Sequence, residues 1–273
     1  MGLRFGYADT AFGQLHYAEQ GTGPALLLLH QTPRSWDEFR ELLPLLAPDH
    51  RVIAMDMVGF GASAALPAPQ TIEAFAAGAR ALLDALEIPV AAVLGHHTGA
   101  AVALEMAVAY RERVAALILS SCPWADADYR RAHADGPAVD RAERTPDGGH
   151  LRALWEQRRP YYPQPGTDLL DRFLRDALAF GVDPAEGHRA CARYRMEDRI
   201  ATVRAPVLLL GAGADPFSIR NLPVLRARLT GAAVVDEVIF TDGTVALIER
   251  EAVPVAAAVR RFLRENATMN RVR

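Results

Sequence analysis

Uniformly apolar stretches alternate with amphipathic helical stretches along most of the chain. The apolar stretches include "ALLLLH" at 25–30, "VAAVLG" at 90–95, "AALILSS" at 115–121 and "APVLLLGAG" at 205–213. Strands of this kind have no face suited to solvent, and parallel neighbours need a crossover, which helices such as the one predicted over 72–86 supply. The pattern therefore predicts an α/β fold with a doubly wound, mostly parallel sheet.

Two departures from this alternation shape the expected domain organisation. Residues 14–30 predict a hairpin whose second arm is a buried strand. From about 123 to 199 the chain becomes polar, carries the breakers "TPDGGH" and "YYPQPGTD", and predicts helices without strands between them. We expect residues 1–122 and 200–266 to form the core, 123–199 a helical cap, and 267–273 a C-terminal tail.

Composition limits the classes of partner. The 273 residues are 51% hydrophobic and 23% charged, with a net charge of -3, which favours a folded protein and offers no basic field for nucleic acid. No stretch reaches the roughly 18 apolar residues of a membrane helix, and no secretory signal is recognised, so a cytoplasmic location without a membrane partner is expected. The two cysteines, Cys122 and Cys191, have no metal-ligand spacing and are expected to be buried and reduced.

Four motifs follow one another in a familiar order. They are "HQTPRSWDEF" at 30–39, "DMVGFGAS" at 56–63, the strand, glycine-flanked corner and helix of "VLGHHTGAAVALEMA" at 93–107, and "LLLGAGADPFS" at 208–218. In this order they resemble the α/β-hydrolase fold with a helical cap, over essentially the full length of the chain. Because this fold hosts hydrolases, lyases and cofactor-free oxygenases, the resemblance is stronger for architecture than for chemistry.

The resemblance assigns roles to particular positions. The corner "GHHTG" places His97 where relatives carry the nucleophilic serine, and Asp215 follows the strand that carries the triad acid. The backbone N–H groups of Thr98 and Thr32 correspond to the oxyanion-hole donors, and Gln31 replaces the usual glycine beside Thr32.

The usual triad is incomplete. Besides the missing serine, "DGTVALIE" places Thr244 where relatives carry the base histidine, so that Asp215 is the only one of the three that remains. Our hypothesis is a dyad in which Asp215 orients His97 as the base. His97 would activate water, attack an acyl carbon itself, or remove a substrate proton as in a lyase. Ester-type hydrolysis is favoured, and the alternative is a catalytically silent small-molecule binder.

Other polar residues near the motifs are interpreted as structural. Ser120, Ser121 and Cys122 end a strand and are favoured as strand-end residues over a relocated nucleophile. His96 and His30 are expected to support the turn and the loop. A metal site from three histidines is not favoured, since adjacent rings on a tight turn diverge.

The cap is expected to set the substrate, a small and apolar or aromatic carbonyl compound, because this segment is rich in aromatic residues. The expected substrate contacts are Gln31, Trp36, Trp124 and Thr244. His188 and the cap arginines, such as Arg158, are interpreted as solvated, although a carboxylate-bearing substrate stays open. No cofactor is expected, because no nucleotide-binding motif and no lysine is present. The oligomeric state stays open.

Overall fold

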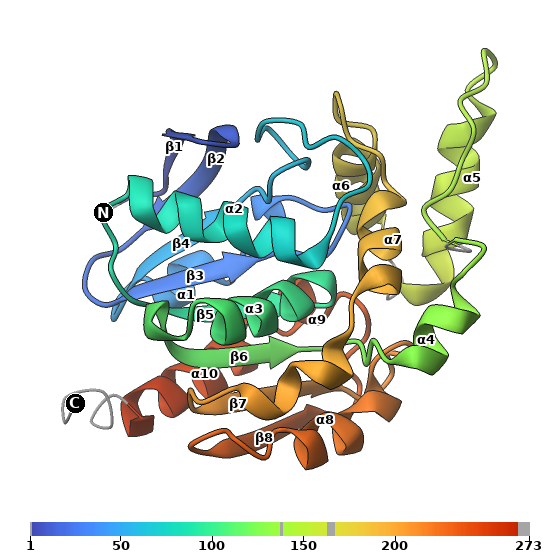
Figure 1. The fold of residues 1–273 in the computed structure, drawn as a ribbon. Helices are drawn as coiled ribbons and strands as arrows, with labels where there is room; N and C mark the ends of the chain where they lie inside the picture. Colours follow the sequence, from blue (N-terminus) through green and yellow to red (C-terminus); the bar gives the residue numbers. More distant parts are fainter. Residues whose placement is uncertain (1, 137–138, 163–166, 267–273) are drawn as a thin grey trace.

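A single eight-stranded sheet runs through the computed structural model, which describes residues 2–136, 139–162 and 167–266 (Figure 1). The strand order is β1-β2-β4-β3-β5-β6-β7-β8. The strands are β1 (Arg4–Thr10), β2 (Gly13–Gln20), β3 (Ala25–Leu29), β4 (Arg51–Met55), β5 (Ala91–His96), β6 (Val114–Ser120), β7 (Val207–Ala212) and β8 (Val235–Phe240). The pairs from β4 through β3 to β8 are parallel, as the apolar stretches predict.

The predicted hairpin within residues 14–30 is wrong. β2 pairs antiparallel with β1 and with β4, whereas β3 lies between β4 and β5 and pairs parallel with both. Leu26 to Leu29 of β3 are fully buried, and a central position with two parallel neighbours satisfies such a strand better than a hairpin at the edge. The hairpin that does form joins β1 and β2.

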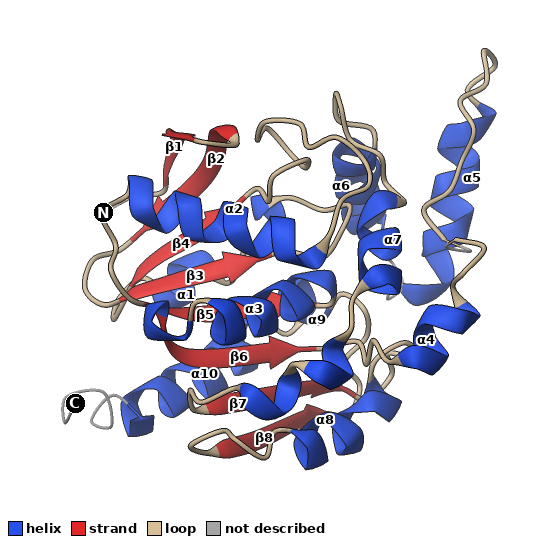
Figure 2. Ribbon diagram, viewed as in Figure 1, coloured by secondary structure: helices blue, strands red, loops and turns tan. Residues whose placement is uncertain are grey.

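Helices cover both faces of the sheet (Figure 2). They are α1 (Leu43–Leu46), α2 (Ile72–Ala85), α3 (Thr98–Ala109), α4 (Ala127–Ala132), α5 (Gly149–Arg158), α6 (Thr167–Ala177), α7 (Glu186–Arg193), α8 (Leu222–Arg228), α9 (Leu247–Arg250) and α10 (Ala252–Asn266). The apolar side chains of α2, α3 and α8 join one buried cluster and those of α1, α9 and α10 another, so the two clusters lie on opposite faces of the sheet. This is the layering of a doubly wound α/β fold.

The helices α4 to α7 follow β6 and precede β7, and no strand interrupts them in the described part of this segment. In Figure 1 they lie beyond the carboxyl ends of the parallel strands, the edge where ligands of such sheets bind. The predicted tail at 267–273 lies outside the described residues. None of the described helices combines the length and apolar character that crossing a membrane would require.

Candidate active site

His97 occupies the corner between β5 and α3 in a strained backbone conformation. Its φ of 47° and ψ of -114° lie outside the regions that a non-glycine residue usually adopts. A Cβ built on Gly95 would lie 2.0 Å from the Gly99 carbonyl oxygen, and one on Gly99 would lie 2.0 Å from the Leu29 carbonyl oxygen. Only glycine fits at both positions, so the helix packs closely against the sheet and His97 stands at the tip.

The structure brings His97 and Asp215 together. His97 Nε2 lies 2.9 Å from Asp215 Oδ2. The contact has the distance of an ion pair, but it lacks hydrogen-bond alignment, since Nε2 is a buried atom without a hydrogen-bond partner. The other ring nitrogen, Nδ1, makes no hydrogen bond within the described residues and is not buried. Because His97 lines the cavity described below, Nδ1 is the nitrogen available to a ligand.

Asp215 is fully buried and well supported. Its Oδ1 accepts a hydrogen bond from the Phe217 N–H at 2.9 Å, and its Oδ2 accepts one from Ser218 Oγ at 2.6 Å. Burial alone would raise the pKa of this carboxyl, but the His97 ring and these donors outweigh it and hold the pKa well below its ordinary value. Asp215 is therefore an anion facing Nε2, which favours a proton on that nitrogen.

His96 and His30 have structural contacts. The His96 ring contacts Ser120 Oγ at 2.9 Å through Nδ1 and the Val245 carbonyl at 3.1 Å through Nε2. Burial, with the neighbouring His97 ring, lowers the pKa of His96 to about 3, so it is neutral. His30 Nε2 accepts the Met57 N–H at 2.9 Å, and burial lowers its pKa as well.

Cys122 and Ser121, directly after β6, show no activating contact within the described residues. The Cys122 thiol is buried, which raises its pKa, and the Ser121 hydroxyl is buried without a hydrogen-bond partner. Within the described ranges, no three His, Cys, Asp or Glu side chains form a group that could hold a metal ion. The rings of His96 and His97 pack edge to face, with centres 4.7 Å apart and an interplanar angle of 82°.

Thr32 and Thr98 lie side by side in the cavity lining. Their hydroxyl oxygens are 3.0 Å apart, and both residues are buried. Neither backbone N–H donates a hydrogen bond within the described residues. Helix α7 presses on this pair, since a Cβ built on Gly187 would lie 1.9 Å from Thr32 Oγ1. Two free amides therefore lie near His97.

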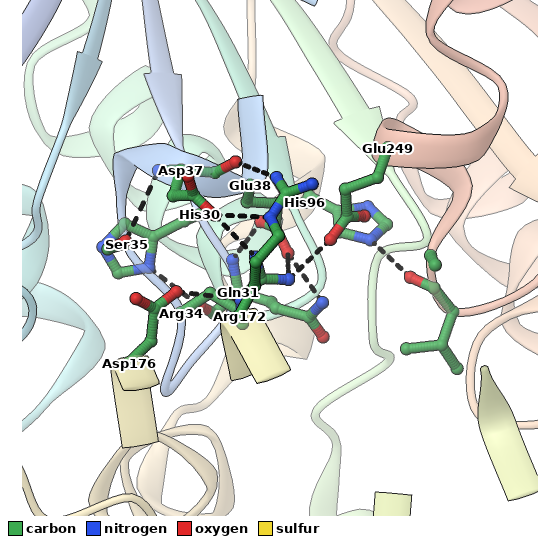
Figure 3. Close-up of polar contacts among 12 residues, drawn as sticks. His30, Gln31, Arg34, Ser35, Asp37, Glu38, His96, Arg172, Asp176 and Glu249 are labelled. Carbon is green, nitrogen blue, oxygen red and sulfur yellow. Dashed lines mark hydrogen bonds and ion pairs between the residues drawn. The ribbon is translucent and has the colours of Figure 1, made fainter. Parts of the chain in front are cut away.

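A buried charge network holds the loop that carries Gln31 (Figure 3). Glu38 accepts the Gln31 backbone N–H at 2.8 Å and the side-chain amide at 2.6 Å. The fully buried Arg34 donates to Glu249 at 2.5 Å and to Asp176 of α6 at 3.0 Å. Burial, reinforced by the Glu249 carboxylate, raises the pKa of Glu38 to about 8. The loop position thus depends on groups from three segments of the chain.

A cavity of about 350 Å³ opens at this end of the sheet. Its described lining comes from the corner, the Gln31 loop, the segment between β6 and β7, the turn between β7 and α8, and the turn before α9: Gln31, Thr32, His97, Thr98, Pro123, Tyr129, Ala132, His133, Gly136, Val139, Arg158, Tyr161, His188, Cys191, Phe217, Arg220, Asn221 and Val245. The volume lies within the range of small-molecule sites.

The structure places several predicted substrate contacts elsewhere. Gln31 lines the cavity, but Trp36, Trp124 and Thr244 are not among its described lining residues. Trp36 packs its ring against Phe5 of β1 at 4.8 Å, and Trp124 donates its indole N–H to the nearby Asp126. Thr244 accepts a weak hydrogen bond in its own turn, and its neighbour Val245 faces the cavity instead.

Two residues interpreted as solvated turn out to line the cavity. Arg158 is buried and pairs with Asp140, and His188 Nε2 lies 2.6 Å from the same carboxylate. Asp140 is separated from them by 18 and 48 residues, so no local pattern could have signalled this cluster.

Comparisons agree with this architecture. The model of the alpha/beta hydrolase fold matches residues 24–239, and the chain belongs to this family. Over 127 residues it is 37% identical to "Bifunctional epoxide hydrolase 2" of Mus musculus. The matched region covers 45% of this chain and only 23% of that protein. Over 105 residues the chain is 36% identical to "2-hydroxymuconate semialdehyde hydrolase" of Pseudomonas sp. (strain CF600), covering 37% of each. These relatives are hydrolases.

Solved structures share the fold. A hydrolase from Pseudomonas aeruginosa PA01 superposes with a TM-score of 0.78 at 23% identity, covering 95% of this chain and 98% of the other. At these identities the likeness establishes the fold alone, so the chemistry has to be argued from the site.

Proposed function

We propose that this protein hydrolyses a small, apolar or aromatic carbonyl compound of the ester type, with His97 as the base, Asp215 as its partner and the α4–α7 segment as a cap over the substrate. The observation that carries the proposal is the orientation of one ring. Nε2 of His97 faces the buried Asp215 carboxylate at 2.9 Å, while Nδ1 is left to the cavity.

The proposed reaction begins with a water molecule between Nδ1 and the substrate carbonyl. Nδ1 takes a proton from the water as its oxygen attacks the carbonyl carbon, and Asp215 stabilises the resulting imidazolium. The carbonyl oxygen gains negative charge and is stabilised by the Thr32 and Thr98 N–H groups. When the tetrahedral intermediate collapses, Nδ1 returns the proton to the leaving oxygen, so that one water is consumed and the base is regenerated.

The same geometry supports direct attack of Nδ1 on the acyl carbon. The acyl C–O bond then breaks, the alcohol leaves, and water hydrolyses the acylated imidazole to the acid and the free ring. Rapid quenching during a single turnover separates the two routes. An acylated His97 that forms and decays at the rate of product release indicates direct attack, and its absence indicates general base catalysis. In both routes the reaction requires Nδ1.

The experiment is a screen of p-nitrophenyl esters with the parent and the His97→Ala variant. We expect the variant to lose about 10²- to 10⁴-fold in kcat, the usual contribution of a general base. His150→Ala, which removes an imidazole outside the cavity lining, is the matched control and should leave kcat unchanged. A serine-directed fluorophosphonate should not label residue 97. Equal turnover by the parent and His97→Ala would reject the proposed role.

The alternative function is a catalytically silent binder. The loss of both the serine and the loop histidine supports it. This alternative predicts that small ligands bind in the cavity while no ester, and no substrate of proton abstraction, is turned over by the parent. The screen therefore distinguishes the two functions.

A further inference from the structure

The ionisable side chains of the described cavity lining are mostly basic. Besides His97, this lining contains two arginines and two histidines, and no aspartate or glutamate. The whole chain carries a net charge of -3, so this bias is local. A concave site lined by one sign of charge concentrates ligands of the opposite sign.

Arg158 is held as a rigid donor on this wall. Its Nε donates to Asp140 Oδ1 at 2.6 Å, its Nη2 pairs with Asp140 Oδ2, and its guanidinium lies 4.8 Å from the centre of the Phe173 ring. The remaining nitrogen, Nη1, has no hydrogen bond within the described residues and is not buried. One edge of a fixed guanidinium is therefore open, and the planar fork of arginine matches a carboxylate.

His188 lies beside Arg158 and shares its carboxylate partner. Its Nε2 lies 2.6 Å from Asp140 Oδ2, so one buried carboxylate serves two basic groups. The His188 ring lines the cavity next to the Arg158 guanidinium, and both are held by the same carboxylate.

Arg220 lies on the same cavity at its exposed side. It has no ion pair or hydrogen bond with another described residue, so its charge is available. Beside it, Phe217 and Tyr161 form an edge-to-face pair with ring centres 4.6 Å apart. Within the described residues, this part of the wall therefore combines an unpaired arginine with an aromatic surface.

We propose that the cavity selects a small monocarboxylate with an apolar or aromatic body, whose carboxylate is bound by Arg158, His188 and Arg220. The inference deepens the proposed function by naming its substrate class, and it rests on that function only for turnover. Binding of the carboxylate does not require the His97 reaction.

Binding is therefore measured directly, by calorimetry with phenylacetate and its neutral isostere phenylacetamide. We expect phenylacetate to bind the parent at least about tenfold more tightly, as a charge-assisted arginine contact provides. Arg220→Gln should weaken phenylacetate binding about three- to tenfold and leave phenylacetamide binding unchanged. Because Arg220 is exposed and unpaired, its replacement does not endanger the fold. Arg264→Gln, on α10 and outside the described lining, is the matched control and should bind like the parent.

A second variant tests the buried part of the subsite. Arg158→Gln with Asp140→Asn removes both charges of the pair, so that no uncompensated carboxylate is left buried, and should lower phenylacetate affinity about tenfold or more. Equal or undetectable binding of the two probes by the parent, or phenylacetate binding unaffected by both variants, would overturn the inference. Phenylphosphonate binding more tightly than phenylacetate would do so as well.

The outcomes separate this inference from the proposed function. His97→Ala should keep phenylacetate binding within about threefold of the parent, because the anion contacts are made elsewhere. Selective carboxylate binding without any ester turnover would reject the proposed function and leave the inference standing. Turnover that depends on His97 but shows no preference for carboxylates would reject the inference alone.

Discussion

Replacing Asp215 with Asn tests how the His97 ring is oriented. In the parent, Asp215 Oδ2 accepts from Ser218 Oγ at 2.6 Å and lies 2.9 Å from His97 Nε2. If the Asn oxygen keeps the Phe217 N–H, its NH₂ group replaces Oδ2 and presents hydrogens to both neighbours. The Ser218 hydroxyl can rotate to accept, but Nε2 can accept only if the proton moves to Nδ1. The nitrogen facing the cavity then becomes a donor and can no longer act as a base.

The expected magnitude follows from two contributions. Loss of general base action costs about 10²- to 10⁴-fold in kcat, or about 3 to 5 kcal/mol of transition-state stabilisation. Loss of a carboxylate 2.9 Å from the imidazolium that forms removes about 6 kcal/mol of attraction at an effective dielectric constant near 20, before desolvation is subtracted. The two figures agree in scale, so we expect kcat of Asp215→Asn to fall about 10²- to 10⁴-fold.

The assay is steady-state hydrolysis of the p-nitrophenyl ester that the parent turns over fastest, with folding of the variant checked by circular dichroism and thermal unfolding. Asp128→Asn, an exposed aspartate of α4 outside the described cavity lining, serves as the control and should keep the parental kcat. A folded Asp215→Asn variant whose kcat stays within about tenfold of the parent would refute the orientation argument.

Further predictions concern the support around the site. Gly187→Ala should lower kcat and the melting temperature, because the new methyl would lie 1.9 Å from Thr32 Oγ1 and must displace the loop or α7. Gly2→Ala, with open space around it, is the control and should change neither quantity. Glu38→Gln should flatten the pH dependence of stability: the folded-state pKa of about 8 lies above the ordinary value, so the contribution of Glu38 is present at pH 4 and is lost as pH rises to 8. Urea unfolding at pH 5 and pH 8 should show the variant gaining relative to the parent at pH 8, and an unchanged difference would contradict the raised pKa. Protonation of Asp215 should destabilise the fold at low pH, since its lowered pKa gives stability that is lost as pH falls below 4, and Asp215→Asn should reduce this loss in acid unfolding.

The parts of the fold that the sequence predicts are those encoded by local composition. The strands β3, β5, β6 and β7 can be predicted from the sequence, because buried strands are apolar along nearly their whole length. The edge hairpin cannot, since β1 is mostly exposed and its pairing with β2 competes with the apolar strand that follows. The prediction that Trp36 contacts the substrate fails for the same reason, because its ring packs against Phe5 of this unpredicted edge strand β1.

The site divides along a similar line. The corner glycines and the position of Asp215 are carried by motifs, and the reach of an imidazole suggests its contact with the acid. The choice of ring nitrogen is different, because it depends on where the cavity opens. The cationic wall is beyond local patterns too, since Arg158 and His188 become buried only through Asp140, which the fold brings to them. Sequence therefore indicates the proposed base and its acid partner more readily than the ligand proposed for the cavity.

The most direct test is to determine which ring nitrogen of His97 carries the proton. It is measured by ¹⁵N NMR of the imidazole at a pH high enough for the ring to be neutral. The account predicts a proton on Nε2, facing Asp215, with Nδ1 unprotonated, and the reverse tautomer in Asp215→Asn. A proton on Nδ1 in the parent, or no difference between the parent and the variant, would contradict it.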